Sequence, residues 1–121
     1  MIQILMAGRE GMGQNREDQD NFWRIYVTGR ARKQREKLPQ DIKAALDLLE
    51  FELATEGPER HNWPHYGKVF GKKKNLDMRH CHLNKNRPCY VAVWVVTDQR
   101  AKLMEIRYVG THENADYGRI N

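Results

Sequence analysis

The sequence predicts an α+β domain in which a helical hairpin packs on an antiparallel sheet of about four strands. Two patterns support this prediction. Apolar residues recur at helical spacing between Ile42 and Leu53, and they alternate with period two in the stretches that follow Leu76. A chain of 121 residues, 40% of them hydrophobic, is long enough to bury one core. We therefore expect a single domain over residues 22–121.

Residues 1–21 differ from the rest of the chain because they carry glycines and the polar run Gln14–Asn21 without an apolar period. We expect a flexible N-terminal extension here. Its apolar stretch Ile2–Ala7 is too short for a signal peptide, and no basic residue precedes it. No apolar run in the chain approaches the ~20 residues of a membrane-spanning helix. These features predict a soluble, cytoplasmic protein that does not contact membranes.

The first predicted strand is Phe22–Thr28, a run rich in aromatic and β-branched residues that ends at Gly29. The basic segment Arg30–Leu38 contains strong helix formers and few apolar residues, which predicts a short exposed helix. A second helix begins near Pro39, a residue that suits a first helical turn, and ends at Gly57-Pro58. Its buried stripe consists of Ile42, Ala45, Leu46, Leu49 and Leu53.

Residues 59–75 are expected to form a loop, and three strands follow it. They are Leu76–Leu83, Cys89–Thr97 and Lys102–Val109. The turns between them are short, which requires antiparallel neighbours. Cys89–Thr97 is apolar on both faces, so it should lie in the centre of the sheet, with the helices covering at least one side. In the last strand, Met104, Ile106 and Tyr108 are expected to share a face.

The net charge of +5 is concentrated in the middle of the chain. Residues 60–87 contain eight Lys and Arg but only one acidic residue, Asp77, together with four of the five histidines. A basic segment of this kind favours a polyanionic partner, and nucleic acid first. A solvated basic surface that keeps the protein soluble is the alternative.

Two histidines on the first strand after the helices are candidates for acid–base chemistry. Strand alternation places His80 and His82 on one face. It places Arg79 and Cys81 on the other. Histidine titrates near neutral pH, so such a pair can accept and donate a proton, whereas hydrogen-bonded structural histidines are the alternative. A zinc site that combines these histidines with Cys81 and Cys89 is disfavoured, because adjacent strand residues cannot share one ion. We expect no metal, no small-molecule cofactor and thiols with a structural role.

Cationic side chains flank this strand and are candidates for binding phosphate groups. They are Lys68, Lys72, Lys73 and Lys74 before it and Lys85 and Arg87 after it. A solvated charged loop is the alternative. Trp63, Tyr66 and Tyr117 are aromatic residues on which bases can stack. These residues together predict a small basic protein that binds RNA or DNA, and they permit a metal-free nuclease.

Short segments along the chain carry a further similarity. They are Arg32-Lys33-Gln34, Lys37-Leu38-Pro39, Gly57-Pro58, Trp63 with Tyr66-Gly67-Lys68, Arg79–Leu83, Pro88–Trp94, Glu105-Ile106, Tyr108–Glu113 and Tyr117. In these segments and their order, residues 22–117 resemble the RelE/ParE superfamily of bacterial toxin–antitoxin toxins, and most of all its branch of cytotoxic translational repressors. The resemblance implies the RelE/ParE-like microbial RNase fold, with the element order β-α-α-β-β-β.

The resemblance also implies an activity and partners. Toxins of this branch are ribosome-dependent mRNA endonucleases that act in the ribosomal A site and inhibit translation. The 2′-hydroxyl of one nucleotide attacks the adjacent phosphate without a metal, which leaves a cyclic phosphate and a free 5′-hydroxyl. The implied partners are mRNA, the ribosome with its rRNA, and a cognate protein antitoxin, whose acidic or amphipathic segment would cover the basic groove.

Catalytic residues follow from the same resemblance. Members with histidine-based sites have one histidine on the first strand after the helices and another after the last strand, and His82 and His112 match these positions. Tyr117 matches an aromatic residue near the C-terminus, one residue later than in that pattern.

The resemblance does not assign a single residue to the cation that stabilises the extra phosphate charge. Arg79 and Arg107 are candidates. Because strand alternation places Arg79 opposite His82, Lys68 or one of Lys72–Lys74 is favoured instead. Two other functions stay open: a ParE-like inhibitor of DNA gyrase, and a basic RNA- or ribosome-binding protein without catalytic activity.

Overall fold

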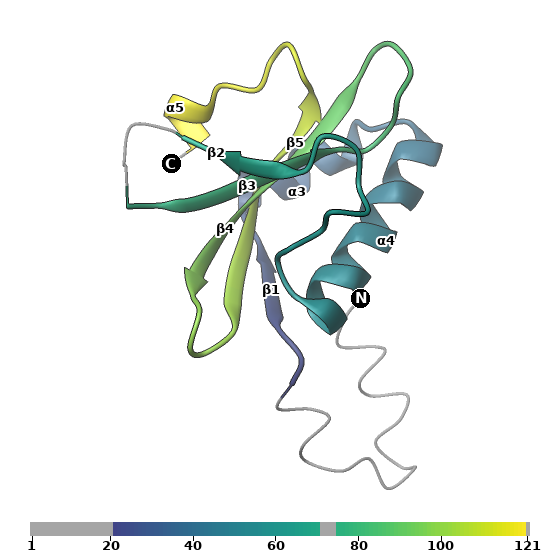
Figure 1. Cartoon of the computed structure of the whole chain (residues 1–121). Helices are drawn as coiled ribbons and strands as arrows, with labels where there is room; N and C mark the ends of the chain where they lie inside the picture. The colour runs from purple at the N-terminus through teal and green to yellow at the C-terminus, as the bar shows by residue number, and fades with distance from the viewer. Residues whose placement is uncertain (1–20, 71–74, 121) are drawn as a thin grey trace, which may run out of the picture.

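The structure is a computed structural model that describes residues 21–70 and 75–120, and its centre is a five-stranded mixed sheet (Figure 1). The strands are β1 (Arg24–Val27), β2 (Gly67–Val69), β3 (Asp77–His82), β4 (Tyr90–Asp98) and β5 (Leu103–Thr111). The helices are α3 (Gly29–Glu36), α4 (Gln40–Glu56) and α5 (Tyr117–Ile120). Across the sheet the order is β1-β5-β4-β3-β2. The expected N-terminal extension lies outside the described residues, apart from Asn21.

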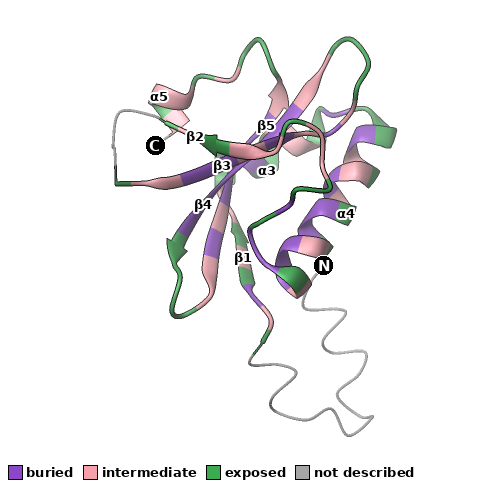
Figure 2. Ribbon diagram, viewed as in Figure 1, coloured by how far each residue is buried: buried purple, intermediate pink, exposed green. Residues whose placement is uncertain are grey.

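The predicted α+β class is confirmed, and β4 lies at the centre of the sheet with both faces buried (Figure 2). On one face, Ala92, Trp94 and Val96 belong to the main core. The buried stripe of α4 packs into the same core, as its helical spacing predicts. On the other face, a second cluster consists of Met78, Val91, Val93, Val95 and Tyr108. Residues near the C-terminus, including Tyr117 and Ile120, pack against this second cluster.

The helical hairpin is held together and tied to the sheet by polar contacts. The hydroxyl oxygen of Thr28 caps α3 by accepting a hydrogen bond from the Ala31 N–H, 3.1 Å away. Arg35 on α3 forms an ion pair with Asp47 on α4 at 2.7 Å. The side-chain carbonyl of Gln34 accepts a hydrogen bond from the backbone N–H of Val109 at 3.1 Å. This last bond attaches α3 to the part of β5 that β1 does not pair with.

Two features of the sheet differ from the sequence prediction, and the C-terminal tail contains an additional helix. β1 pairs in parallel with β5, so the sheet is mixed and not wholly antiparallel. The short turns determine only the pairing of β3, β4 and β5, whereas the neighbour of β1 depends on packing across the intervening helices. Gly67–Val69, inside the predicted loop, forms β2 and adds a fifth strand at the edge. The polar C-terminal tail contains a short helix, α5.

The predicted common face of Met104, Ile106 and Tyr108 is wrong at Tyr108. A register shift places Val93 opposite Tyr108 but Trp94 opposite Ile106, so Arg107 is an extra residue in β5. Such a bulge reverses the alternation of side chains beyond it. Met104 and Ile106 therefore face the main core, whereas Tyr108 joins the second cluster.

Over residues 21–70 and 75–120, none of the helices has the length and apolar character needed to span a membrane.

The end of α4 depends on a glycine. Gly57 has a φ of 95°, where only glycine is unstrained, and a Cβ built there would lie 3.2 Å from the indole Nε1 of Trp23. We predict that Gly57→Ala lowers the free energy of unfolding by about 1–3 kcal/mol, as measured by urea denaturation. Gly29→Ala is the matched control, because a Cβ at Gly29 meets no atom within 4 Å. Equal stability of the two variants would contradict this account of Gly57.

Candidate active site

Four histidine rings come together on the sheet face that the C-terminal segment covers. His82, the last residue of β3, lies at the centre of the group. Its ring centroid is 4.2 Å from that of His65, 5.2 Å from that of His112 and 6.0 Å from that of His80. His65 and His112 are exposed, whereas His80 and His82 are partly buried. The group is therefore accessible to solvent on one side.

Backbone hydrogen bonds at the ends of three strands bring these rings together. The backbone N–H of His82 donates to the carbonyl of Pro64 at 2.8 Å, which places the loop residue His65 against β3. The backbone N–H of His112, just beyond β5, donates to the carbonyl of Cys89 at 2.8 Å. In the sheet, His82 lies opposite Val91, which in turn lies opposite Gly110. The site thus combines residues that are distant in the sequence.

The loop that carries His65 is anchored to α4 by one carboxylate. The Oε1 atom of Glu52 accepts hydrogen bonds from Arg60 at 3.1 Å, Asn62 at 2.9 Å and the indole N–H of Trp63 at 2.8 Å. Burial opposes ionisation of Glu52, but these hydrogen bonds outweigh it and lower the pKa of the carboxyl group. The ionised carboxylate therefore fastens the loop to α4.

Cys89 contacts the ring of the central histidine. Its Sγ lies 3.1 Å from Nδ1 of His82 and also donates to the carbonyl of Asn84 at 3.7 Å. Burial raises the pKa of the Cys89 thiol, so its proton is retained. When the S–H donates to Asn84, the sulfur can only accept from Nδ1–H of His82. With the ring proton on Nδ1, Nε2 of neutral His82 keeps a free lone pair, which is what a general base requires.

Tyr117 and His80 form the buried side of the group. The hydroxyl oxygen of Tyr117 lies 3.3 Å from Nδ1 of His80, and the two rings meet edge to face. Burial raises the pKa of Tyr117. Burial, with a smaller effect from the three nearby histidines, lowers the pKa of His80 to about 4. Burial followed by the charges of His65 and His112 also lowers the pKa of His82. Both strand histidines are therefore neutral at pH 7.

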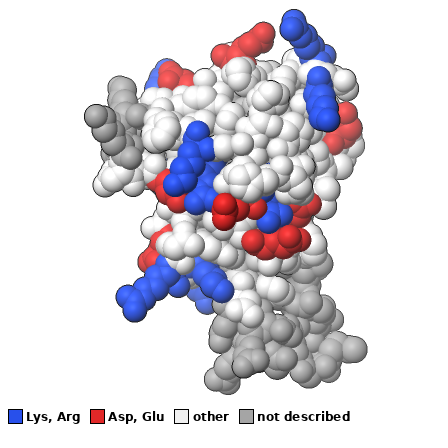
Figure 3. All heavy atoms as spheres, in the orientation of Figure 1, with Lys and Arg blue, Asp and Glu red and all other residues white. Residues whose placement is uncertain are grey.

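The structure brings together several of the residues singled out from the sequence. His82, His112 and Tyr117 lie in one group, and His80 joins them. Lys85 and Arg87 are exposed in the turn that follows His82. Lys72, Lys73 and Lys74 lie outside the described residues. On the face shown in Figure 3, basic side chains alternate with acidic ones.

Two of the proposed cations lie away from the histidines. Arg79 is on the opposite face of β3, as strand alternation predicts, and its guanidinium binds Asp77 at 3.0 Å and the hydroxyl of Tyr66 at 2.9 Å. Lys68 on β2 lies opposite Arg79 and forms an ion pair with Asp77 at 3.9 Å. These contacts explain why neither residue is placed to stabilise charge beside His82.

His65 and Cys89 were not assigned a role in this site from the sequence. His65 lies in a loop without periodicity and has a φ of 55°, so no pattern gives its direction. The sequence predicts only a structural thiol at Cys89, although its position at the start of a strand next to the strand of His82 indicates a contact with that histidine. Within residues 21–70 and 75–120, no three His, Cys, Asp or Glu side chains are arranged to hold a metal ion.

Comparison with solved structures identifies the fold. A chain of the crystal structure of the archaeal RelE-RelB complex from Pyrococcus horikoshii OT3 matches with a TM-score of 0.61 over 78% of this chain and 99% of that chain. The fold is RelE-like. The sequence identity is only 17%, so the likeness concerns the fold. No protein-family model and no curated protein matches the chain. In this RelE-like fold, the histidine group lies where β3, β4 and the residues after β5 meet.

The low pKa of His80 makes stability depend on pH. The unfolded state, with a pKa near 6.5, binds a proton that folded His80 does not bind above about pH 4. Stability from this group is therefore present above pH 6.5 and is lost as the pH falls toward 4. We predict a loss of about 1 kcal/mol between pH 7 and 5, after allowance for partial exposure.

Because burial raises the pKa of Glu50 to about 7 and gives the opposite slope, the measurement compares urea unfolding of wild type with His80→Asn. His61→Asn, at an exposed position, is the control. The same pH slope in wild type and His80→Asn would contradict the prediction.

Proposed function

We propose that the chain is the toxin of a bacterial toxin–antitoxin pair and that it cleaves mRNA on the ribosome by a metal-free reaction at the histidine group. The observation that carries the proposal is the pairing of His82 and His112 at 5.2 Å, with a neutral His82 whose Nδ1 is engaged by Cys89. The RelE-like fold and the basic composition support the same proposal.

The proposed reaction needs two proton transfers. Nε2 of His82 takes the proton of a ribose 2′-hydroxyl as the 2′ oxygen forms a bond to the adjacent phosphorus. The bond between phosphorus and the 5′ oxygen of the next nucleotide breaks, and His112 gives that oxygen a proton. The products are a 2′,3′-cyclic phosphate and a free 5′-hydroxyl. The two histidines then exchange their protons with solvent.

Charge stabilisation and substrate positioning fall to other residues in this proposal. Lys85 and Arg87 are the described cations that follow His82 in the chain, and we propose that they contact the phosphate backbone. Lys72–Lys74 stay candidates on the basis of the sequence alone. Tyr117, which is partly buried and packs against the second cluster, holds His80 in place in this proposal.

The proposed partners follow from the comparison. The matching structure is a complex of RelE with RelB, and by analogy we propose a protein antitoxin for this chain. Engagement of the ribosome is proposed because the sequence resembles translational repressors of the same superfamily. The cytoplasm, where ribosomes translate mRNA, is the proposed location.

We predict that His82→Ala and His112→Ala each reduce cleavage by ~10²-fold or more, because each removes a proton-transfer group. The assay is a reconstituted translation mixture programmed with one mRNA, in which new 5′ ends are mapped with and without ribosomes. Wild type should cut at codon-phased positions only with ribosomes, and the new 5′ ends should carry a free hydroxyl. His61→Ala is the control, because His61 is exposed and meets Tyr66 edge to face outside the group.

Other results of that assay select other functions. Uncut mRNA with folded wild-type protein would reject the nuclease. DNA damage on expression, with intact mRNA, would then indicate a gyrase inhibitor. Ribosome binding that is sensitive to lysine substitutions but not to histidine substitutions would indicate a binding protein without catalysis.

We predict that Cys89→Ala lowers cleavage by roughly 10-fold, because Nδ1 of His82 loses the partner that orients it. Cys89→Ser should restore most of the activity, since a hydroxyl can accept from Nδ1 and donate to a carbonyl. The pH profile of cleavage should move in Cys89→Ala and return in Cys89→Ser. Equal activity of all three proteins would show that Cys89 does not position His82.

A further inference from the structure

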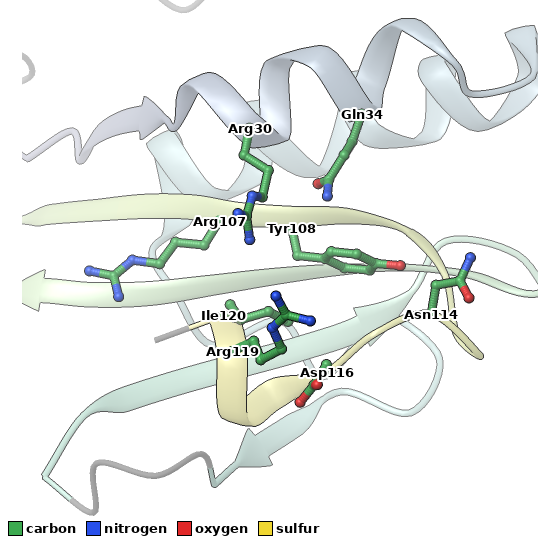
Figure 4. A pocket seen from close by; sticks show the side chains of 8 residues that line it. All are labelled: Arg30, Gln34, Arg107, Tyr108, Asn114, Asp116, Arg119 and Ile120. Atoms are coloured by element: carbon green, nitrogen blue, oxygen red, sulfur yellow. The ribbon is translucent and has the colours of Figure 1, made fainter.

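A second polar site lies beside the histidine group, between α3, β5 and the C-terminal segment (Figure 4). It is a pocket of about 310 Å³. This volume is at the lower end of the range for ligand-binding pockets. The residues that line it are Arg30, Gln34, Arg107, Tyr108, Asn114, Asp116, Arg119 and Ile120. Three of them are arginines and one is acidic, so the pocket has an excess of positive charge.

Two of the arginines lack a neutralising partner among the described residues. Arg107 forms an ion pair with Glu105 at 2.9 Å, and in Figure 4 its side chain extends away from the pocket. Arg30 and Arg119 form no ion pair within residues 21–70 and 75–120. In Figure 4, Arg30 points from α3 toward α5, and Arg119 points from α5 toward α3. Two guanidinium groups that face each other repel. An anion bound between them would attract both and make the net electrostatic energy favourable.

The remaining lining residues suit a singly charged oxyanion. The side-chain carbonyl of Gln34 is occupied by the N–H of Val109, which leaves its NH₂ group as a donor. One carboxylate oxygen of Asp116 accepts from the N–H of Gly118 at 3.1 Å, so this acid is used in part to hold α5. The Asp116 carboxylate is still negatively charged, so the pocket disfavours a doubly charged anion as its ligand. Guanidinium forks bind phosphate oxygens with matched geometry, and a phosphodiester carries a single charge.

The position of α5 connects this pocket to the proposed active site. Tyr117, at the start of α5, contacts His80, whereas Arg119, two residues later, lines the arginine pocket. Tyr108 belongs to the pocket and to the apolar cluster that Tyr117 packs against. The histidine group and the pocket therefore lie on two sides of the same short helix.

We propose that this pocket binds one phosphodiester group of an RNA strand, next to the group that is cut, through Arg30 and Arg119. The choice of RNA as the ligand rests on the proposed function. The pocket fixes the position of the strand relative to His82 and His112, which bind and transform the neighbouring linkage.

The test measures binding without cleavage. The probe is a fluorescent single-stranded RNA whose 2′-hydroxyls are all methylated, so that no 2′ oxygen can attack, and its affinity is measured by anisotropy over a range of salt concentrations. We expect Arg30→Gln and Arg119→Gln each to weaken binding about 10-fold and to reduce the salt slope by about 0.7. The fold-loss of RNA affinity in the double variant should be smaller than the product of the fold-losses in the two single variants, because both arginines hold the same phosphate.

Arg100→Gln is the matched control. It removes the same charge from an exposed position in the turn between β4 and β5, far along the sheet from the pocket (Figure 1). Arg30 and Arg119 are also exposed, and unfolding curves of the variants check that the fold is kept. The proposal would be overturned if Arg30→Gln and Arg119→Gln lose no more RNA affinity than Arg100→Gln does. It would also be overturned if the fold-losses of affinity in the two single variants multiply in the double variant. Equally tight binding of a polyglutamate peptide, lost in the same variants, would also overturn it in favour of carboxylates.

This result is separate from the test of catalysis. A protein that binds this RNA through the pocket but cuts no mRNA would reject the nuclease and keep the pocket. If the wild type cuts mRNA but the arginine variants bind RNA as tightly as the wild type, the proposed nuclease activity would stand and the proposed phosphate site in the pocket would be rejected.

Discussion

The whole molecule depends on the burial of β4 on both faces. A strand that is apolar on both sides must be covered twice, and residues 91–96 are all buried. The helical hairpin covers one face. The other face is covered by Met78, Tyr108 and the C-terminal segment with Tyr117 and Ile120. Covering the second face is what carries the chain back from β5 toward β3. The histidine group arises where that returning segment meets the end of β3.

The histidines of this group differ in their surroundings. His80 lies against Tyr117 on the buried side, where desolvation keeps it neutral. His82 lies at the boundary between core and solvent and is held by Pro64 through its backbone and by Cys89 through its ring. His65 and His112 flank it on the solvent side. Burial thus separates a structural histidine from the ones that solvent and substrate can reach, although all four lie on one sheet face.

Periodicity was enough to predict the parts of the structure that are regular. The stripe from Ile42 to Leu53, the central place of β4 and the opposite faces of Arg79 and His82 all follow from spacing and are confirmed. The juxtaposition of His82 with His112 followed from the resemblance, and their roles stay predictions. Spacing gave no information on His65, whose position depends on three hydrogen bonds to Glu52. It also failed at Tyr108, because one extra residue in β5 reverses the alternation there.

The outer strands of the sheet have a consequence for self-association. β1 spans four residues and β2 spans three, and these two strands form the edges. Beyond the end of β1, the backbone N–H of Val109 on β5 donates a hydrogen bond to the side-chain carbonyl of Gln34. Short edges offer few free backbone groups to an incoming strand, and charged side chains such as Lys68 on β2 oppose such pairing. Intermolecular sheet growth therefore finds only short templates at the described edges, although the central strand of the sheet is highly apolar.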